Sequence, residues 1–287
     1  MVAIILDGKR TAQEIQKELS LKVKEEGIIP GVAVIRVGED PSSLIYIRNK
    51  KKRAEEVGIY FEEHTLKENT SQDELIELIK KLNSNSRIDG IVLQLPLPKH
   101  LDEKRMLEKI SPEKDVDGFH PLNMGRLLKG NPLFIPATPR GIMELLSRYL
   151  ISLKGKRVVV VGRSNIVGKP LALLFLKEDA TVAICHSKTK DLDLITKEAD
   201  ILVVAIGKPE FIREGMVKEN SVVIDVGINR VGNRIMGDVD FKRIKEKVSH
   251  ITPVPGGVGP MTIIMLLKNV IEAAESRKIN AKLKQEK

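Results

Sequence analysis

The stretch Val158–Pro170, which reads VVVVGRSNIVGKP, decides the fold predicted for this chain. Consecutive valines favour a buried strand, because β-branched side chains pack well in a sheet that is covered on both faces. Gly162 ends that strand, and a helix is expected to begin near residues 166–168. Such a turn lets the backbone approach an anion, and the helix start offers free N–H groups to a phosphate. Because the spacing is not G-x-G-x-x-G, a glycine turn needed only for its geometry stays an alternative.

The next strand, Thr181–Cys185, indicates which dinucleotide binds. A site for NAD commonly carries an acid about 20 residues after the first glycine, where it accepts from the ribose hydroxyls. Residues 181–190 contain no acid, and the strand is followed by His, Ser, Lys and Thr. These donors, with Arg163 in the turn, suit a 2′-phosphate, so NADP is predicted rather than NAD. The predicted cofactor-binding residues are Gly162, Arg163, Ser164, Val167, Gly168, His186, Ser187 and Ile228.

Strand and helix patterns alternate on both sides of this stretch. Before it, strands are predicted at 31–37, 60–65 and 90–97, and helices at 42–58 and 72–84. After it, further strands are predicted at 200–205 and 221–226. Strands that alternate with helices of about 10–15 residues indicate βαβ units and a mostly parallel sheet. The chain is therefore predicted to be an α/β protein.

A domain boundary is predicted near residue 140. Thr138 and Pro139 are expected to cap and open a helix that runs to about Tyr149. We predict one domain over 1–140 and a Rossmann-like, doubly wound parallel domain over 141–261. An apolar spacing typical of a helix follows, and this C-terminal helix, about 262–287, is expected to pack back on the first domain.

Composition restricts the class of protein. With 287 residues, 42% hydrophobic and 30% charged, the chain suits two ordinary globular domains. The one cysteine, Cys185, forms no internal disulfide, and it is expected to be inert. No apolar run approaches the roughly 18 residues that a membrane span needs, and the N-terminus does not read as a signal peptide. These features predict a cytoplasmic protein without membrane contact.

The net charge of +9 leaves three explanations open. Nucleic-acid binding is one, but aromatic residues are only 3% and no motif of a nucleic-acid-binding domain stands out. Small polyanionic ligands explain the charge equally well, and so does a solvated surface rich in lysine.

Three polar features of the first half are unusually placed. Tyr46 and Lys50 are four residues apart on a predicted helix, so they share a face. Gln94 interrupts an apolar strand near its carboxyl end, and 115–118 form an acidic turn. Each has an ordinary structural explanation: a surface pair, an edge-strand glutamine and an Asx turn.

Together with the second half, these features resemble a known family. The blocks occur in this order: S-x-x-Y-x-x-x-K at 43–50, QLPLP at 94–98, PEKDVDG at 112–118, GRS…VGKP at 162–170, CHS at 185–187 and TPVPGGVGPMT at 252–262. The chain is similar over essentially its whole length to the bifunctional methylenetetrahydrofolate dehydrogenase/methenyltetrahydrofolate cyclohydrolase (FolD) family. No motif position departs from the family pattern.

The resemblance implies two reactions in one cleft between the domains. The first moves a hydride from 5,10-methylenetetrahydrofolate to NADP, and the second hydrolyses the resulting methenyl cation to 10-formyltetrahydrofolate for purine biosynthesis. It further implies a homodimer formed through the second domain. No metal and no nucleic acid are expected to take part. A dehydrogenase that has lost the hydrolysis, and a basic nucleic-acid-binding protein with a Rossmann domain, stay alternatives.

Four residues are expected to carry the chemistry. Lys50 is the candidate base or proton relay for hydrolysis, provided that its pKa is lowered. Gln94 is expected to hold the Lys50 amine, and Tyr46 to orient the folate. Asp117 is expected to accept from the pterin N–H groups. The predicted substrate-binding residues are Tyr46, Lys50, Gln94, Asp117, Pro255, Gly256 and Gly257.

Overall fold

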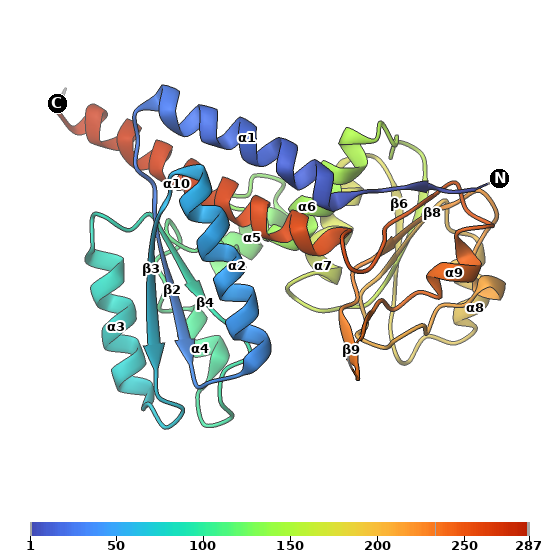
Figure 1. The fold of residues 1–287 in the computed structure, drawn as a ribbon, viewed down its shortest axis with the longest axis horizontal. Helices are drawn as coiled ribbons and strands as arrows, with labels where there is room; N and C mark the ends of the chain where they lie inside the picture. Colours follow the sequence, from blue (N-terminus) through green and yellow to red (C-terminus); the bar gives the residue numbers. More distant parts are fainter. Residues whose placement is uncertain (1, 233, 286–287) are drawn as a thin grey trace. The chain divides into compact units, whose positions relative to one another are not determined.

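The computed structural model describes residues 2–232 and 234–285, with no side chain described at 41–43, 45 and 280–285. The chain divides into two compact units (Figure 1). Met1–Gln13 and Thr138–Thr262 form what we call the six-stranded unit. Glu14–Ala137 and Ile263–Lys287 form the three-stranded unit. Both units contain parallel sheets with helices, which confirms the predicted α/β class.

The sheet of the three-stranded unit has the order β3-β2-β4, and its strands are parallel. The central strand β2, Gly31–Val37, is buried along its whole length. β3 spans Tyr60–Leu66 and β4 spans Gly90–Leu93. β4 is shorter than predicted, because prolines follow it closely and proline has no N–H to donate to a neighbouring strand. Gln94 therefore lies just beyond the carboxyl end of β4.

Helices of the three-stranded unit cover the sheet. α2 spans Pro41–Val57 and α3 spans Gln72–Ser84, close to the predicted bounds. The apolar side chains of α3 pack against Ala33 and Ile35 of β2. Two short helices follow β4: α4 at Glu103–Leu107 and α5 at Pro121–Leu128.

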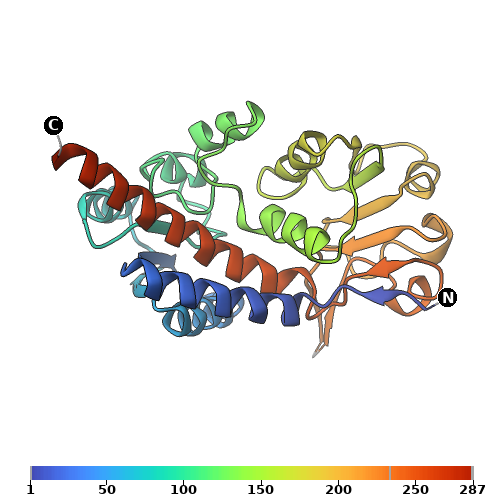
Figure 2. The ribbon, with the colours of Figure 1, turned by 90° about the horizontal axis from the view of Figure 1, so that it is seen from above.

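The C-terminal helix α10, Val258–Gln285, packs on the three-stranded unit as predicted. Asn269 of α10 is fully buried, and its Nδ2 donates to the carbonyls of Val116 at 2.7 Å and Ile135 at 2.9 Å. α1, Gly8–Glu26, runs beside α10, where Lys22 pairs with Glu275 at 2.6 Å (Figure 2).

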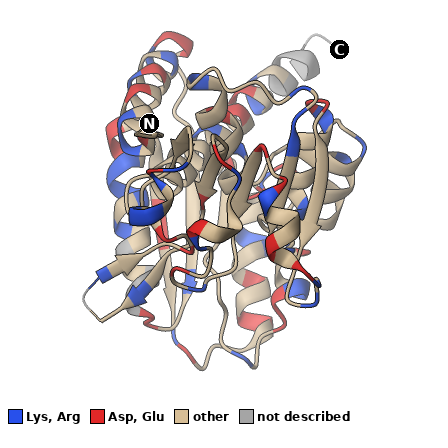
Figure 3. Cartoon of the chain, turned by 90° about the vertical axis from the view of Figure 1, so that its right-hand side faces the viewer, with Lys and Arg blue, Asp and Glu red and all other residues tan. Residues whose placement is uncertain are grey.

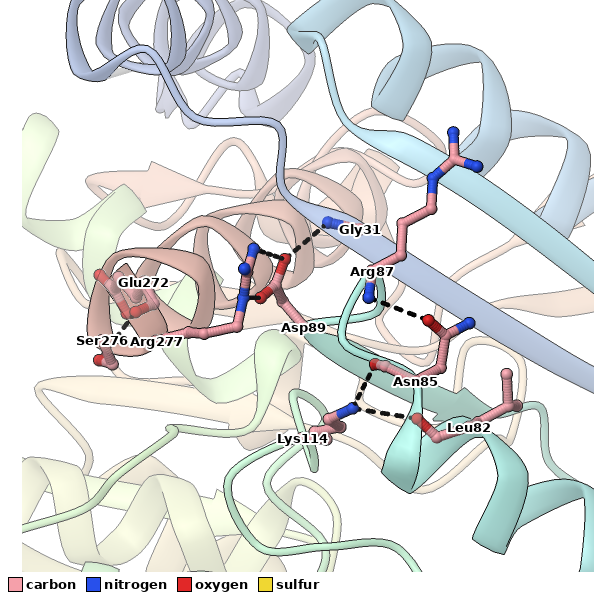
Figure 4. Close-up of polar contacts among 9 residues, drawn as sticks. All are labelled: Gly31, Leu82, Asn85, Arg87, Asp89, Lys114, Glu272, Ser276 and Arg277. Carbon is pink, nitrogen blue, oxygen red and sulfur yellow. Dashed lines mark hydrogen bonds and ion pairs between the residues drawn. The ribbon is translucent and has the colours of Figure 1, made fainter. Parts of the chain in front are cut away.

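A buried carboxylate also fastens α10 to the sheet (Figure 4). Asp89 precedes β4, and its Oδ2 accepts from the N–H of Gly31 at 2.9 Å. The guanidinium of Arg277, on α10, donates to both oxygens of Asp89. Nearby, Lys114 donates to two carbonyls at the end of α3, that of Leu82 in its last turn and that of Asn85 just after it. These contacts hold the amino ends of β2 and β4 to α3 and α10.

The sheet of the six-stranded unit has the order β1-β11-β8-β7-β5-β6. All its paired neighbours are parallel. The strands are β1 (Ile4–Ile5), β5 (Arg157–Val161), β6 (Thr181–Cys185), β7 (Ile201–Val204), β8 (Val222–Asp225) and β11 (His250–Ile251). The other elements are α6 (Ala137–Arg148), α7 (Gly168–Lys177), α8 (Leu192–Lys197), the 3-10 helix η1 (Glu214–Met216), the hairpin β9 (Asn229–Val231) and β10 (Arg234–Met236), and α9 (Phe241–Ile244). The unit β5-α7-β6, in which a helix joins two parallel neighbouring strands, is the predicted Rossmann-like arrangement.

Two details differ from the sequence-based expectation. The first residues of the chain belong to the six-stranded unit rather than to a domain over 1–140, because β1 pairs with β11 through Ile4 and His250. The prediction that Thr138 caps α6 is wrong, since the helix already begins at Ala137. The hydroxyl of Thr138 instead lies 2.9 Å from that of Thr262.

No described helix is long and apolar enough to cross a bilayer. Lys and Arg are scattered among Asp and Glu over the visible part of the molecule (Figure 3). This interspersed pattern is typical of a solvated surface rich in charge.

Candidate active site

Lys50 is the centre of a polar cluster at the carboxyl end of the three-stranded sheet. It lies on α2, one turn after Tyr46, and only 5% of it is exposed. Its Nζ donates to Oε1 of Gln94 at 3.2 Å and lies 4.9 Å from the centre of the Tyr46 ring. Gln94 donates its Nε2 to the carbonyl of Leu95, so its oxygen faces the lysine. The side chain of Ser43 lies outside the described part of the chain.

Burial and one carboxylate act in opposite directions on Lys50. Burial lowers the pKa of Lys50, because the charged amine loses its hydration, while the negative charge of Asp117 raises it. Burial likewise raises the pKa of Asp117, and Lys50 opposes that shift. A lowered pKa makes a buried amine release its proton more readily, which a base or proton relay needs. The structure thus brings all four predicted catalytic residues into one unit.

The turn that carries Asp117 is held by Asp115, a residue that sequence reasoning did not single out. Asp115 is buried and accepts from the N–H groups of Phe119 (3.1 Å) and His120 (2.8 Å). It also accepts from Nδ2 of buried Asn123 at 2.7 Å. Burial raises the pKa of Asp115 to about 7. Three donors on one carboxyl group fix the turn around Asp117.

The turn after β5 requires glycine at two positions. Gly162 has φ = +135°, and a Cβ there would overlap the carbonyl of Ala205. A Cβ on Gly168 would overlap the carbonyl of Gly162. Oγ of Ser164 accepts from the N–H groups of Val167 (3.1 Å) and Gly168 (3.3 Å), so it caps the start of α7. Only glycine fits at these two positions of the turn.

The end of β6 lies beside this turn at the same edge of the sheet. Gly162 donates its N–H to the carbonyl of Cys185 at 2.9 Å, and His186 and Ser187 follow directly. Arg163 is exposed and makes no hydrogen bond or ion pair with the described residues. Burial raises the pKa of the Cys185 thiol, which suits an inert residue. Arg163 and His186 are therefore available to an anionic ligand.

A cavity of about 160 Å³ joins the loop after β8 to the PVPGG segment. Ile228, which is 61% exposed, lines it together with Pro255, Gly256 and Gly257. Gly256 has φ = +108° and accepts from the N–H of Lys9 at 2.8 Å. The predicted cofactor residue Ile228 and three predicted substrate residues therefore meet in one cavity.

The predicted site residues fall into two sets. The catalytic set lies in the three-stranded unit, and the dinucleotide set with the PVPGG segment lies in the six-stranded unit. Residues that sequence reasoning missed are Asp115, Asn123, Asp225, Asn229 and Asp238. In the sequence, each of them is simply a polar residue beside a predicted strand or turn. Many surface residues have the same setting, so this signal does not distinguish them.

Family models match both parts of the chain. The model described as "tetrahydrofolate dehydrogenase/cyclohydrolase, catalytic domain" matches residues 6–117. The model described as "tetrahydrofolate dehydrogenase/cyclohydrolase, NAD(P)-binding domain" matches residues 136–278.

Curated relatives are similar over nearly their whole length. The bifunctional protein FolD of Acetivibrio thermocellus is 54% identical, over 99% of this chain and 100% of the relative. That of Moorella thermoacetica is 57% identical, over 96% of this chain and 99% of the relative.

Solved structures show the same fold. The bifunctional FolD enzyme of Campylobacter jejuni superposes with a TM-score of 0.93 at 49% identity, covering 96% of this chain and 99% of that one. The Trypanosoma brucei enzyme, solved with NADP cofactor and an inhibitor, has a TM-score of 0.93 at 39% identity with the same coverage. Family models, relatives and structures agree, and the chain belongs to the tetrahydrofolate dehydrogenase/cyclohydrolase family.

Proposed function

We propose that Lys50, Tyr46, Gln94 and Asp117 carry the chemistry of this bifunctional enzyme. The enzyme oxidises 5,10-methylenetetrahydrofolate to 5,10-methenyltetrahydrofolate with NADP and hydrolyses that product to 10-formyltetrahydrofolate. The observation that carries the residue assignment is the buried Lys50 amine, which is held by Gln94 and has a lowered pKa.

The dehydrogenase step depends on positioning. Loss of a hydride from the methylene carbon leaves a delocalised cation, so this step needs no general base. Asp117 accepts from the pterin N–H groups, and Tyr46 orients the ring system. NADP, when bound, supplies the hydride acceptor. The residues that fit its phosphates and 2′-phosphate are the Gly162 turn, the start of α7 and the exposed Arg163.

The cyclohydrolase step depends on proton transfer. Water adds to the methenyl carbon and releases a proton, which the neutral Lys50 amine accepts. The proton then passes to the folate nitrogen that leaves when the ring opens. Gln94 keeps the amine in place because its own amide is anchored to the carbonyl of Leu95. The positive charge of the methenyl substrate lowers the pKa of Lys50 further, since like charges repel.

Substitution of Lys50 tests this assignment. We expect Lys50→Met to lower cyclohydrolase turnover about 10²–10⁴-fold, the usual contribution of a general base, and to retain hydride transfer to NADP. The matched control is Lys51→Met, because Lys51 is the next residue on α2 and is exposed. Absorbance of methenyltetrahydrofolate, followed with and without NADP, measures both steps. Wild-type ring opening in Lys50→Met would remove Lys50 from this role.

We propose further that the enzyme is a cytoplasmic homodimer whose product serves purine biosynthesis. The observation that supports dimerisation through the six-stranded unit is the edge strand β6. Ile184 of β6 is 41% exposed, although it lies in an apolar strand. Unpaired strand edges with exposed apolar residues are common sites of association. The single cysteine supports a reducing compartment.

A further inference from the structure

Asp238 is a fully buried carboxylate whose donors come from two separate loops of the six-stranded unit. Its Oδ2 accepts from the N–H groups of Ile206 (2.7 Å) and Gly207 (3.0 Å). Its Oδ1 accepts from the N–H of Lys208 and from Nδ2 of Asn229, both at 2.8 Å. The first three donors follow β7 and Asn229 follows β8, so one side chain ties the exits of two adjacent strands together.

A second buried carboxylate continues the network. Asp225, the last residue of β8, accepts from the N–H groups of Gly227, Asp238 and Val239, each at 2.9 Å. Neither carboxylate forms an ion pair with a Lys, Arg or His among the described residues. Burial raises the pKa of Asp225 to about 7, and its three N–H donors oppose that shift. Both carboxylates are held by directed N–H groups, which demands that the loops keep one conformation.

Two glycines lie so close to the carboxylates of Asp238 and Asp225 that neither has room for a side chain. A Cβ at Gly227 would overlap Oδ1 of Asp238, and a Cβ at Gly237 would overlap Oδ2 of Asp225. Gly227 and the next residue, Ile228, line the 160 Å³ cavity. Asp238 thus lies directly behind the wall of that cavity.

We propose that Asp238 is the positioning residue of the dinucleotide site, holding the 206–208 loop and the Gly227–Ile228 segment in the conformation that receives NADP. The inference rests on the proposed function and on the prediction from the sequence that Ile228 contacts the cofactor. Asp238 itself acts only through the backbone, because it is fully buried behind Gly227. Its role should therefore appear in cofactor binding and not in the chemistry of the folate.

Asp238→Asn is the sharpest variant, because it changes no volume. Each oxygen of Asp238 accepts two N–H groups, so the new amide NH₂ must face two donors and cannot accept from either. Asn229→Ala is the milder variant, since it removes one donor and leaves the carboxylate intact. Asp240→Asn is the matched control: Asp240 lies two residues further along and caps α9 through the N–H of Arg243.

The readout uses the fact that ring opening needs no NADP. Titration calorimetry gives the Kd of NADP, and methenyltetrahydrofolate supplied without NADP gives the cyclohydrolase rate. We expect Asp238→Asn to raise the Kd of NADP and its KM at least tenfold, with a cyclohydrolase rate within twofold of wild type. Asn229→Ala should raise the Kd by a few-fold, and Asp240→Asn should change neither quantity.

These measurements distinguish a failure of the proposed function from a failure of the positioning role of Asp238. A wild-type protein that neither binds nor reduces NADP contradicts the proposed function itself. If the wild type is active and folded Asp238→Asn keeps the wild-type Kd, the positioning role is wrong. It is equally wrong if both activities fall together, which marks a purely structural role. Should Asp238→Asn not fold, an unchanged Kd in Asn229→Ala overturns the inference.

Discussion

In its proposed role, Lys50 has to meet two requirements that conflict in water: its amine must be held in place, and it must lose its proton easily. Gln94 holds the amine through an uncharged oxygen, so it adds no negative charge that would stabilise the ammonium form. Asp117 does stabilise that form, but burial acts more strongly in the opposite direction. The balance between burial and Asp117 therefore sets the pH at which Lys50 becomes a base.

Asp117→Asn should shift the pH dependence of ring opening towards acid. The carboxylate raises the pKa of Lys50, so its removal lowers that pKa further, and the neutral amine prevails at lower pH. The rising limb of cyclohydrolase kcat, measured at saturating folate, should move to lower pH, while KM for folate increases. Glu113→Gln is the control, because Glu113 is an exposed acid of the same segment. A limb that stays in place or moves to higher pH would contradict this account of Lys50.

Arg163→Ala should weaken the preference for NADP over NAD. A hydrogen bond to a charged group contributes about 1.5–3 kcal/mol, and Arg163 is exposed, so we expect a loss of about tenfold in the NADP/NAD ratio of kcat/KM. Arg157→Ala is the control, since Arg157 lies at the other end of β5. An unchanged preference in Arg163→Ala would show that another residue recognises the 2′-phosphate.

Sequence reasoning singles out polar residues in unusual places more readily than residues that hold the backbone. Lys50 and Gln94 stand out because a polar residue on an apolar face or strand is unusual, and they lie 3.2 Å apart as expected. Asp115 and Asp238 look like ordinary turn acids in the sequence. Their importance comes from N–H groups such as that of Ile206, 32 residues from Asp238, and no local pattern shows such a distant pairing.

At the scale of elements, the pair Arg277–Asp89 fastens α10 to the start of β4 (Figure 4). The side chain of Asp89 is fully buried, whereas that of Arg277 is 50% exposed. The guanidinium therefore reaches inward from the surface to neutralise a charge that has no access to water. Among the residues that the structure describes, the other donor to the Asp89 side chain is the N–H of Gly31.

Arg277→Ala should lower the free energy of unfolding by about 1–2 kcal/mol, because it leaves a buried carboxylate without its cation. The exposure of Arg277 keeps the expected loss below the value for a fully buried pair. Lys80→Ala, which removes the exposed pair with Glu77, should cost at most about 0.5 kcal/mol. Urea unfolding curves measure both changes, and equal midpoints for the two variants would contradict a structural role of Asp89 and Arg277.

Most elements could be predicted from the sequence, and the exceptions have physical reasons. The strand at 31–37 and the helix at 72–84 occur at their predicted bounds, because each contains a strong apolar pattern. β1 contains only Ile4 and Ile5, which is too short for any periodicity to reveal. Its place beside β11 depends on residues almost 250 positions away.

At the scale of the whole molecule, the two edges of the six-stranded sheet allow a matched test of assembly. Ile184→Lys on β6 should convert the proposed dimer to a monomer of 32.0 kDa, because a charge opposes burial of the strand edge. Ile4→Lys on β1 places the same charge at the opposite edge, where Ile4 is 54% exposed, and should leave the dimer intact. Sedimentation equilibrium distinguishes the two results. A wild-type monomer, or dissociation by Ile4→Lys alone, would contradict association through β6.

Each unit is built from two segments that lie far apart in the sequence, and this affects how the chain can fold during its synthesis. The six-stranded sheet takes an edge strand from the beginning of the chain, whose partner β11 is translated some 245 residues later. The three-stranded unit takes α10 from beyond β11. The three-stranded unit therefore cannot be completed before α10 is translated, and the six-stranded sheet cannot be completed before β11, although domains commonly fold in order as they emerge. The nascent chain must keep its unfinished strands from pairing wrongly until then.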